Sequence, residues 1–339
     1  MSNEQELQMI SEMRRLIYGN WQTCVTYAFA ELGIADILQD QTLSAAELST
    51  ETGTNPHALL RFLRCCGQIG FVQIDVDKAG FYLTPFGRLL ASDHPLSQRD
   101  AARLNGADYR YQPWGFLTDI LKAGHSRGFS PTVERGSLDY LADKPDKLGV
   151  FQRAMTNLSV NEDQVIAEAW DFSNFKVVVD IGCGHGTLIK AILNANSHLA
   201  GIMFDLEEVL SEVDISEDCF NGRLTQQMGS FFDSVPKEGD VYVMKNVIHN
   251  WPEERAIALL ENTRKAMSND DRLLIVEYLI PEDNELSIVK WIDLNFFVLV
   301  DGADRTADEY TALAEKAGLK IVSFIATETG RHIIELAAN

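Results

Sequence analysis

The stretch VVVDIGCGHGTL at residues 177–188 decides the fold of this chain. Its apolar, β-branched beginning is typical of a strand that is covered on both faces of a parallel sheet. Gly182, Gly184 and Gly186 then occupy every second position, where glycine allows a tight turn and a close approach of the backbone to a ligand. Sheets of this kind bind ligands at the carboxyl ends of their strands. The stretch therefore predicts an α/β domain with a ligand-binding loop directly after this strand.

The spacing of these glycines excludes two common nucleotide sites. A dinucleotide fingerprint needs a third glycine where this chain has Thr187, and the chain contains no GxxxxGK[ST] phosphate-binding loop. Asp180 precedes the glycines, and its carboxylate would repel a pyrophosphate but attract an ammonium group. A second strand-like run, GIMFDLEEV, ends in Asp205, where a carboxylate commonly binds ribose hydroxyls. Together the two carboxylates predict a nucleoside with a cationic tail, which describes S-adenosylmethionine (SAM).

The composition of the whole chain excludes several classes of protein. The chain has 339 residues, of which 46% are hydrophobic, and this predicts two cores and excludes a disordered or collagen-like protein. A formal net charge of −21 disfavours a general affinity for nucleic acids or anionic membranes, because both reward lysine and arginine. The five cysteines form no CxxC pair, so we expect reduced thiols and neither a disulfide framework nor a zinc site.

The N-terminal sequence predicts where the protein is found. MSNEQELQMISEMRRL is polar and acidic where a secretory signal would be basic and then apolar. No stretch of the chain approaches the roughly 18 consecutive apolar residues of a membrane span. We therefore expect a cytoplasmic protein that does not associate with membranes.

Residues 1–95 carry the signals of two short helices followed by a hairpin. LSAAELSTETG offers Ser44 as an N-cap with Glu47 three residues later, and TNPHALL offers Asn55 as an N-cap with Pro56 at the first helical position. FVQIDVDKAGFYLTPFGRLL then predicts two strands around DKAG, so we predict a winged helix. Apolar helices such as WQTCVTYAFAELGIADIL carry more hydrophobic surface than so small a unit can bury, which predicts homodimerisation.

A winged helix also allows a function of another class, a DNA-binding regulator whose C-terminal domain senses a metabolite. Arg61 and Arg64 lie on the second predicted helix, where a recognition helix would carry them. The sequence LLRFLRCC is apolar around both arginines, which indicates packing in an interior or a dimer interface instead. We therefore expect no nucleic acid as a partner.

The rest of the chain divides into a helical segment and an α/β domain. Residues 96–170 predict helices, including WGFLTDILKAG and KLGVFQRAMTNLSVNEDQVIAEAW. Strand-like and helical runs then alternate, and the strand-like ones are KVVVDIG, LAGIMFDL, GDVYVMKNVI, DRLLIVEYLI, KIVSFIAT and HIIELAA. This alternation predicts a Rossmann-like, doubly wound, mostly parallel sheet with an antiparallel terminal hairpin at one edge. We divide the chain into a mainly helical winged-helix dimerisation domain at 1–95, a helical linker at 96–170 and a ligand-binding domain at 171–339.

Three titratable residues are predicted to gather at the carboxyl edge of this sheet. His249 follows the strand GDVYVMKNVI, and a histidine can accept a proton near neutral pH. The next strand ends at Glu277, and the loop DGADRT supplies Asp304, so two carboxylates can bracket the imidazole. From this we predict a general base that is held by acidic neighbours.

The order and the spacing of five motifs carry a resemblance to a known family. These motifs are VVDIGCGHGT, FDLEEV, MKNVIHNWPEERA, LLIVEYLIP and GADRTADEYTALAEKAG. With them the chain resembles the dimeric, SAM-dependent small-molecule O-methyltransferases that carry a winged-helix dimerisation domain. That family includes plant caffeic acid methyltransferases, hydroxyindole O-methyltransferase and bacterial enzymes that tailor polyketides and phenazines. The resemblance covers the chain from about Arg14 to its end.

The resemblance implies roles for individual residues. It makes His249 the general base, with Glu277 and Asp304 as its flanking acids. The residues that would contact SAM are Asp180, Gly182, Gly184, Asp205, Leu206, Ser230, Phe231 and Lys245. The residues that would line the acceptor pocket are Phe151, Met155, Trp251 and Phe296. The first two of these fit an apolar helix face in the core equally well. No metal is expected.

Three positions depart from the family pattern. Ser230 stands where many relatives have an aspartate near the adenine. Asn250 replaces the aspartate that usually follows the histidine, which is expected to lower the basicity of His249. Asp304 replaces a longer glutamate. The base itself is kept, which favours methyl transfer over the non-methylating relatives that share the fold.

The sequence thus predicts a SAM-dependent O-methyltransferase (EC 2.1.1) that acts as a homodimer. It would transfer a methyl group to a hydroxyl of a small aromatic acceptor of the secondary-metabolite kind and release S-adenosylhomocysteine. Aromatic side chains such as Phe296 suit a flat, largely apolar acceptor. Two alternatives stay open at this point. One is transfer to nitrogen or carbon on the same fold, and the other is the SAM-binding regulator.

Overall fold

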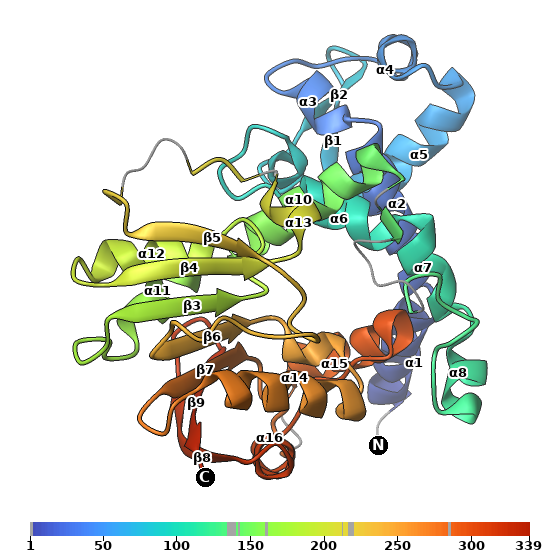
Figure 1. Ribbon diagram of the computed structural model, residues 1–339. Coiled ribbons are helices and arrows are strands. Elements are labelled where there is room, and N and C mark those ends of the chain that lie inside the picture. Colours follow the sequence, from blue (N-terminus) through green and yellow to red (C-terminus); the bar gives the residue numbers. More distant parts are fainter. Residues whose placement is uncertain are drawn as a thin grey trace. The chain divides into compact units, whose positions relative to one another are not determined.

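A computed structural model describes residues 3–133, 140–141, 143–159, 162–211, 213–215, 220–283 and 286–339 of the chain. The chain forms two compact units (Figure 1). The first comprises Met1–Gly115 and Leu138–Leu158, and the second comprises Phe116–Ser137 and Ser159–Asn339. The segment predicted as a helical linker therefore contributes helices to both units.

The first unit consists of helices and one small hairpin. Ser44 and Glu47 form a capping box at the start of one helix, since the Ser44 Oγ accepts from the Glu47 N–H and the Glu47 carboxylate accepts from the Ser44 N–H at 2.8 Å. The Asn55 side chain caps the next helix by accepting two backbone N–H bonds. Both predicted helix starts are confirmed, and so is the antiparallel hairpin. The elements are α1 (Asn3–Ile17), α2 (Gly19–Glu31), α3 (Ile34–Leu38), α4 (Ala45–Thr52), α5 (Pro56–Ile69), β1 (Val72–Asp75), β2 (Gly80–Leu83), a 3-10 turn (Gly87–Leu90), α6 (Arg99–Gly106), α7 (Asp108–Trp114) and α10 (Pro145–Ser159).

Helix α1 leaves its apolar side chains uncovered. It has no buried residue, and Ile10, Met13 and Ile17, which share one face, are 44%, 57% and 62% exposed. The core of the unit lies elsewhere, around Phe29 and Leu63. An uncovered apolar stripe of this length marks an interaction surface.

Seven strands form the sheet of the second unit, in the order β5-β4-β3-β6-β7-β9-β8. The first five pair in parallel, and β9 pairs antiparallel with both β7 and β8 (Figure 1). This confirms the mostly parallel sheet with an antiparallel hairpin at one edge. The strands are β3 (Val177–Ile181), β4 (Ala200–Asp205), β5 (Leu224–Met228), β6 (Val241–Lys245), β7 (Arg272–Glu277), β8 (Leu319–Ala326) and β9 (His332–Ala338).

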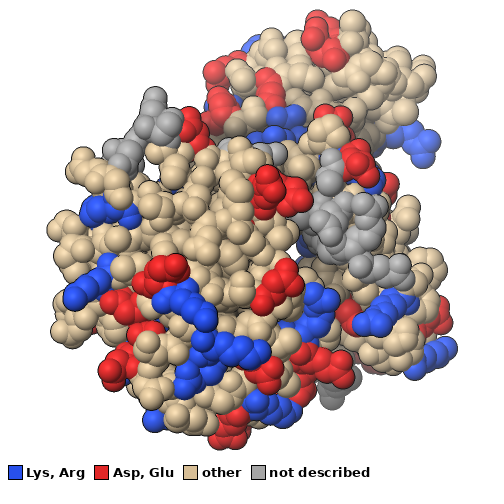
Figure 2. Space-filling view, in the orientation of Figure 1, with Lys and Arg blue, Asp and Glu red and all other residues tan. Residues whose placement is uncertain are grey.

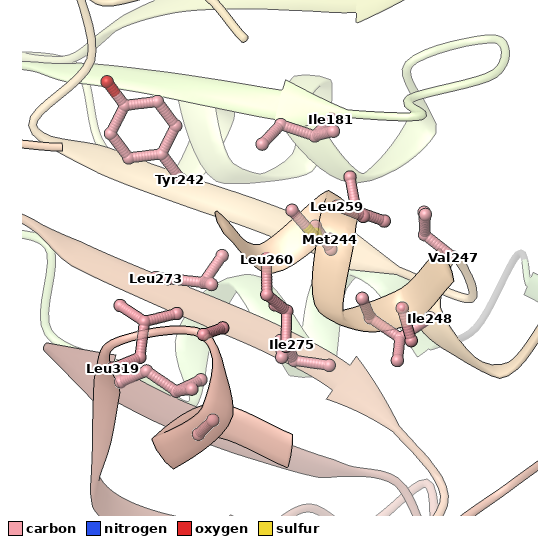
Figure 3. Close-up of a cluster of buried hydrophobic side chains, with 14 of the residues drawn as sticks. Ile181, Tyr242, Met244, Val247, Ile248, Leu259, Leu260, Leu273, Ile275 and Leu319 are labelled. Carbon is pink, nitrogen blue, oxygen red and sulfur yellow. The ribbon is translucent and has the colours of Figure 1, made fainter. Parts of the chain in front are cut away.

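Helices cover both faces of this sheet. Val179 and Ile181 of β3 pack in a cluster with Leu259 and Leu260 of α14. Figure 3 shows Ile181, Leu259 and Leu260 of this cluster. Val178, whose side chain points to the other face, packs with residues of α11 and α12. The helical elements of the second unit are α8 (Leu117–Ala123), α11 (Glu162–Glu168), α12 (Thr187–Ala195), α13 (Glu207–Leu210), a 3-10 turn (Ile248–Asn250), α14 (Glu253–Ala266), α15 (Ile288–Val300) and α16 (Ala307–Lys316). The apolar run of β3 is therefore explained by burial on two faces.

The parallel pairing places the carboxyl ends of four strands along one edge. The glycine loop follows β3, Asp205 ends β4, Lys245 ends β6 and Glu277 ends β7. These strands are neighbours in the sheet, so residues that are far apart in the sequence meet at one place. This edge is where a ligand of an open α/β sheet is expected.

The surface carries both signs of charge. Figure 2 shows acidic and basic side chains lying among one another on the face drawn there, and Lys316, for example, contacts Glu253. None of the described helices combines the length and the apolar character that crossing a bilayer requires.

Candidate active site

The loop after β3 is folded tightly. Gly182, Gly184 and Gly186 have φ values of 69°, 54° and 70°, in the left-handed region that glycine adopts without strain. The Gly182 N–H donates to the Phe204 carbonyl at 2.8 Å, and a Cβ at Gly182 would lie 2.9 Å from the Val247 side chain. A Cβ at Gly184 would meet no atom within 4 Å. The backbone of this loop therefore borders open space, where a ligand can approach it closely.

Asp205 lies against the glycine loop. Its Oδ2 accepts from the Gly184 N–H and its Oδ1 accepts from the Leu206 N–H, both at 2.8 Å. Burial raises the pKa of Asp205, and the two backbone donors lower it in part. A carboxylate placed at this strand end can accept hydrogen bonds from two ribose hydroxyls. The structure thus brings Asp205, Leu206 and Gly184 to one place.

Asp180 is a buried carboxylate, and one of its oxygens accepts no hydrogen bond from the described residues. Its residue is 2% exposed, and no group of the described residues donates to its Oδ2. Burial, followed by the negative charges of Asp163 and Asp205, raises the pKa of Asp180 to about 7. A bound cation would relieve this repulsion. The ammonium and sulfonium groups of SAM fit such a place, and the residues present therefore fit this cofactor.

Lys245 reaches the same edge but its ammonium is already paired. The Nζ contacts the Asp163 carboxylate and lies 3.6 Å from Glu162. Arg331 at the start of β9 donates to Glu162 at 2.7 Å and to the Asn246 side chain at 2.6 Å. Lys245 thus belongs to a network of ion pairs, and its positive charge lowers the pKa of the nearby Asp180.

Ser230 and Phe231 belong to a segment that follows β5. A Cβ at Gly182 would lie 3.7 Å from the Phe231 ring, so this ring borders the glycine loop. The Ser230 Oγ accepts from the Phe232 N–H at 3.2 Å. The Asn262 side chain of α14 donates to the carbonyls of Phe231 and Phe232 at 3.1 and 2.7 Å. Asn262 therefore holds this segment in place.

His249 lies between two carboxylates. Its Nδ1 is 2.8 Å from the Glu277 Oε2 and 3.2 Å from the Asp304 Oδ1. The three residues are 6%, 0% and 2% exposed. The Phe296 ring of α15 packs on the imidazole, with ring centres 4.0 Å apart. Because Nδ1 is directed at the carboxylates, Nε2 is the ring nitrogen that can exchange a proton with a bound molecule.

The two carboxylates decide the basicity of His249. Burial alone lowers the pKa of the imidazole, but Glu277 and Asp304 more than offset this and raise it to about 9. That Asn250, in place of an aspartate, lowers the basicity of His249 stays a prediction. The Asn250 side chain donates to the carbonyls of Asn246 and Val247 and so stabilises the turn that carries His249. The shorter Asp304 nevertheless reaches the imidazole.

The aromatic residues that the sequence assigns to the acceptor lie in different places. Phe296 contacts His249, as described above. Trp251 packs edge-on against Phe232, with ring centres 4.7 Å apart, and the Arg255 guanidinium lies over its ring. Phe151 and Met155 lie on α10 in the first unit, where Phe151 packs against a small apolar cluster and Met155 is 37% exposed. Their role toward an acceptor stays a prediction.

Several residues of this edge are not indicated by the sequence patterns. Asn262 acts on backbone carbonyls about 30 residues away, and Asp163 pairs with a lysine on another element. Arg305 is a further residue of this kind, and only its position directly after Asp304 connects it in the sequence with the predicted site. The arrangement can bind a cationic nucleoside beside Asp180 and Asp205, and it can hold a proton on His249 nearby.

Two family models match the chain. An O-methyltransferase domain matches residues 114–320, and an O-methyltransferase dimerisation domain matches residues 15–93. Among curated relatives, the phenazine O-methyltransferase PhzM of Lysobacter antibioticus is 34% identical over 327 residues, which are 96% of this chain and 95% of that protein. An 8-amino-8-demethylriboflavin N,N-dimethyltransferase of Streptomyces davaonensis is 30% identical and covers 88% of this chain and 86% of its own length.

Solved structures agree with this. The crystal structure of the O-methyltransferase NcsB1 from neocarzinostatin biosynthesis, in complex with SAM and 2-hydroxy-5-methyl naphthoic acid, matches with a TM-score of 0.84 at 25% identity. The match covers 94% of this chain and 96% of that one. By these matches and by its glycine loop and carboxylates, the chain belongs to the family of SAM-dependent small-molecule O-methyltransferases with an N-terminal dimerisation domain, and its cofactor is SAM.

Proposed function

We propose that this enzyme transfers the methyl group of SAM to a hydroxyl of a small aromatic acceptor, with His249 as the general base. One observation carries the proposal. The Nδ1 of the buried imidazole is hydrogen-bonded to Asp304 at 3.2 Å and lies 2.8 Å from the Glu277 carboxylate, at the sheet edge where Asp180 and Asp205 would hold the cofactor. Release of labelled product from SAM and a panel of hydroxylated aromatics tests it, and mass and NMR analysis of the product identify the methylated atom.

The residues of the site have different roles in the proposed reaction. When bound, SAM supplies a methyl group on a sulfonium, from which the neutral thioether departs readily as S-adenosylhomocysteine. Asp180 and Asp205 bind and orient it, and such positioning can contribute ~7 kcal/mol or more to the lowering of the barrier. His249 accepts the proton of the acceptor hydroxyl at Nε2, which contributes ~3 to 5 kcal/mol. Glu277 and Asp304 stabilise the imidazolium that forms and fix the orientation of the ring.

We assign further contacts on the same grounds. The cofactor would also be bordered by the remaining residues named from the family motif, which are Gly182, Gly184, Leu206, Ser230, Phe231 and Lys245. Phe296, stacked on His249, would contact the acceptor together with Trp251, and the family motif also assigns Phe151 and Met155 to the acceptor. The order α4, α5, β1, β2 supports the winged-helix interpretation of residues 1–95. Free Cys24, Cys65, Cys66 and Cys183 support a cytoplasmic location.

The activity is expected to depend on pH through His249. The charged groups next to the ring are Glu277 of β7 and Asp304, whose backbone N–H donates to the Asp293 carboxylate of α15. Since the base must be neutral to accept a proton and its pKa is raised to about 9, kcat/KM should rise about tenfold per pH unit below that pKa and level off above it. Steady-state rates from about pH 6 to about pH 10 check this. Glu277→Gln should shift the rise of kcat/KM to lower pH, because it removes a negative charge that raises the pKa of His249. A wild-type kcat/KM that does not change with pH would contradict the role of His249 as the base.

A nitrogen acceptor is the second candidate. The riboflavin-derivative dimethyltransferase described above methylates an amine according to its name, and its sequence matches over most of both chains. Aniline and phenol analogues of the same ring, offered in competition, distinguish the two. Exclusive methylation of the amine would replace the hydroxyl in the proposal. The regulator alternative is weakened because the chain belongs to an enzyme family, although Arg61 and Arg64 are exposed on α5.

The dimerisation domain at residues 15–93 supports a homodimer, and the exposed apolar stripe of α1 supports a part for this helix in the interface. Replacing Met13, in the exposed apolar stripe of α1, with aspartate would place a charge in the interface. Met13→Asp is therefore expected to raise the dimer dissociation constant by about tenfold or more. Sedimentation velocity at several concentrations measures this. Ser11→Asp adds the same charge on another face of α1 and serves as the control, and equal dissociation of both variants would exclude the stripe as the interface.

A further inference from the structure

The short loop that carries Asp304 is fastened to the backbone around His249. The Ala303 N–H donates to the His249 carbonyl at 2.9 Å, and the Asp304 N–H donates to the Asp293 carboxylate at 3.0 Å. A Cβ at Gly302 would lie only 2.2 Å from the His249 carbonyl oxygen. Only glycine allows the loop to lie this close, so the distance between Asp304 and His249 is determined by backbone contacts as well as by the ion pair.

Arg305 joins the three segments that carry the three site residues. Its side chain donates to the Ala303 carbonyl at 2.9 Å and to the Trp251 carbonyl at 3.0 Å. Its own carbonyl accepts from the Ile280 N–H at 3.0 Å. Trp251 stands two residues after His249, Ile280 three residues after Glu277, and Arg305 itself directly after Asp304. Arg305 thus links the backbone segments that carry His249, Glu277 and Asp304.

The buried guanidinium of Arg305 is bonded to backbone carbonyls. Arg305 is 6% exposed, yet the two bonds described above go to carbonyl oxygens and the Tyr310 ring packs 6.0 Å from the charge. Burying a cation is costly, and a planar fork of donors can hold two carbonyls in a fixed geometry that the single ammonium of lysine cannot. Arginine therefore suits this position by the planar arrangement of its donors as well as by its charge.

We propose that Arg305 is a positioning residue for the general base: by holding the Trp251 and Ala303 carbonyls together, it keeps Asp304 at bonding distance from His249. The proposal rests on the proposed function, in which His249 accepts the acceptor proton. Arg305 touches neither cofactor nor acceptor in this role. It acts through Asp304, so its effect must disappear when Asp304 no longer bonds to the imidazole.

A double-mutant cycle tests this dependence. Arg305→Lys keeps the charge and loses the fork. Above about pH 9, where the imidazole of His249 is neutral in both enzymes, it is expected to lower kcat by roughly 10- to 100-fold while the Kd for SAM stays within about twofold. Asp304→Asn should have an effect of similar size. In the Asp304→Asn background, Arg305→Lys should lower kcat by no more than about twofold further. Full additivity of the two substitutions would overturn the proposal.

Arg223 offers a matched control. Its guanidinium also donates to a backbone carbonyl, that of Leu199 at 2.7 Å, but it lies before β5 at the amino edge of the sheet. Arg223→Lys should leave kcat within about twofold of wild type even where it lowers the Tm. If it reduces kcat as much as Arg305→Lys does, the effect of Arg305 is one of general stability and the proposal is wrong.

A second readout does not depend on methyl transfer. NMR titration of the imidazole signals gives the pKa of His249, which is assigned by its loss in His249→Gln. Since Arg305→Lys keeps the charge but releases Asp304, the pKa of His249 should fall, as it should in Asp304→Asn. An unchanged pKa would overturn the proposal even if no acceptor is ever found. A lowered pKa in Arg305→Lys, together with a His249→Ala enzyme that transfers methyl as fast as wild type, would instead support the positioning role and refute the proposed function.

One alternative variant keeps the test usable. Should Arg305→Lys fail to bind SAM, Gly302→Ala takes its place in the same cycle, because it crowds the same loop against the His249 carbonyl. It should lower the pKa of His249 and kcat in the same directions. A Gly302→Ala enzyme with the wild-type pKa and kcat would show that the loop does not position the base.

Discussion

Replacing His249 with alanine is expected to lower kcat by about 100- to 10,000-fold and to leave the Kd for SAM within about twofold of wild type. In the proposed function the imidazole accepts the acceptor proton, whereas Asp180 and Asp205 bind the cofactor. A residual rate should survive, because the orientation of the two reactants does not need the base. Single-turnover methyl transfer and calorimetric titration with SAM measure the two quantities on the same preparations.

The control for this substitution is His198→Ala. His198 bonds to the Phe172 carbonyl at 3.2 Å and precedes β4, at the edge of the sheet opposite the site. It should retain kcat within about twofold, since it touches no part of the proposed machinery. If His249→Ala transfers methyl as fast as wild type at every pH while it binds SAM normally, the assignment of the base is wrong.

The second large effect is expected at Asp205, where alanine should weaken SAM binding by about 100-fold or more. Each hydrogen bond from a ribose hydroxyl to a buried carboxylate is worth about 1.5 to 3 kcal/mol, and the substitution removes two. It also removes the acceptor of the Gly184 N–H, which loosens the glycine loop. Titration calorimetry of the purified variant with SAM measures the loss.

A comparable carboxylate serves as the control for Asp205. Asp240 also accepts two backbone N–H bonds, from Lys176 at 2.8 Å and Val177 at 2.9 Å, but at the opposite ends of the strands. Asp240→Ala should lower the Tm, and its Kd for SAM should stay within about threefold of wild type. A normal Kd in Asp205→Ala would show that the carboxylate does not hold the cofactor.

Much of the fold could be predicted because its strands are buried on two faces. Unbroken apolar runs at β3, β4, β6 and β7 leave few alternatives to a parallel sheet. The strand β5, LTQQM, was not predicted, because it lies at an edge and carries polar residues such as Gln226 with only Leu224 fully buried. The helix predicted from WGFLTDILKAG begins only at Leu117, since Gly115 and its neighbour separate it from α7.

The site could be predicted where its residues directly follow strands. Parallel strands bring such residues to one edge, so the amino-acid sequence alone indicates that His249, Glu277 and Asp205 lie near one another. Residues that act on the backbone of a distant segment, such as Asn262 and Arg305, leave no periodicity or motif in the sequence. Their partners are carbonyl groups, which every residue carries, and only three-dimensional contacts identify them.

The most direct measurement of the central claim is transfer of labelled methyl from SAM to a mixed panel of hydroxylated aromatics, with wild type, His249→Ala and His198→Ala side by side. The account predicts product on oxygen from wild type and His198→Ala, and a yield lower by about 100-fold or more from His249→Ala at equal SAM occupancy. Wild-type and His249→Ala enzymes that form the same product at the same rate would contradict it.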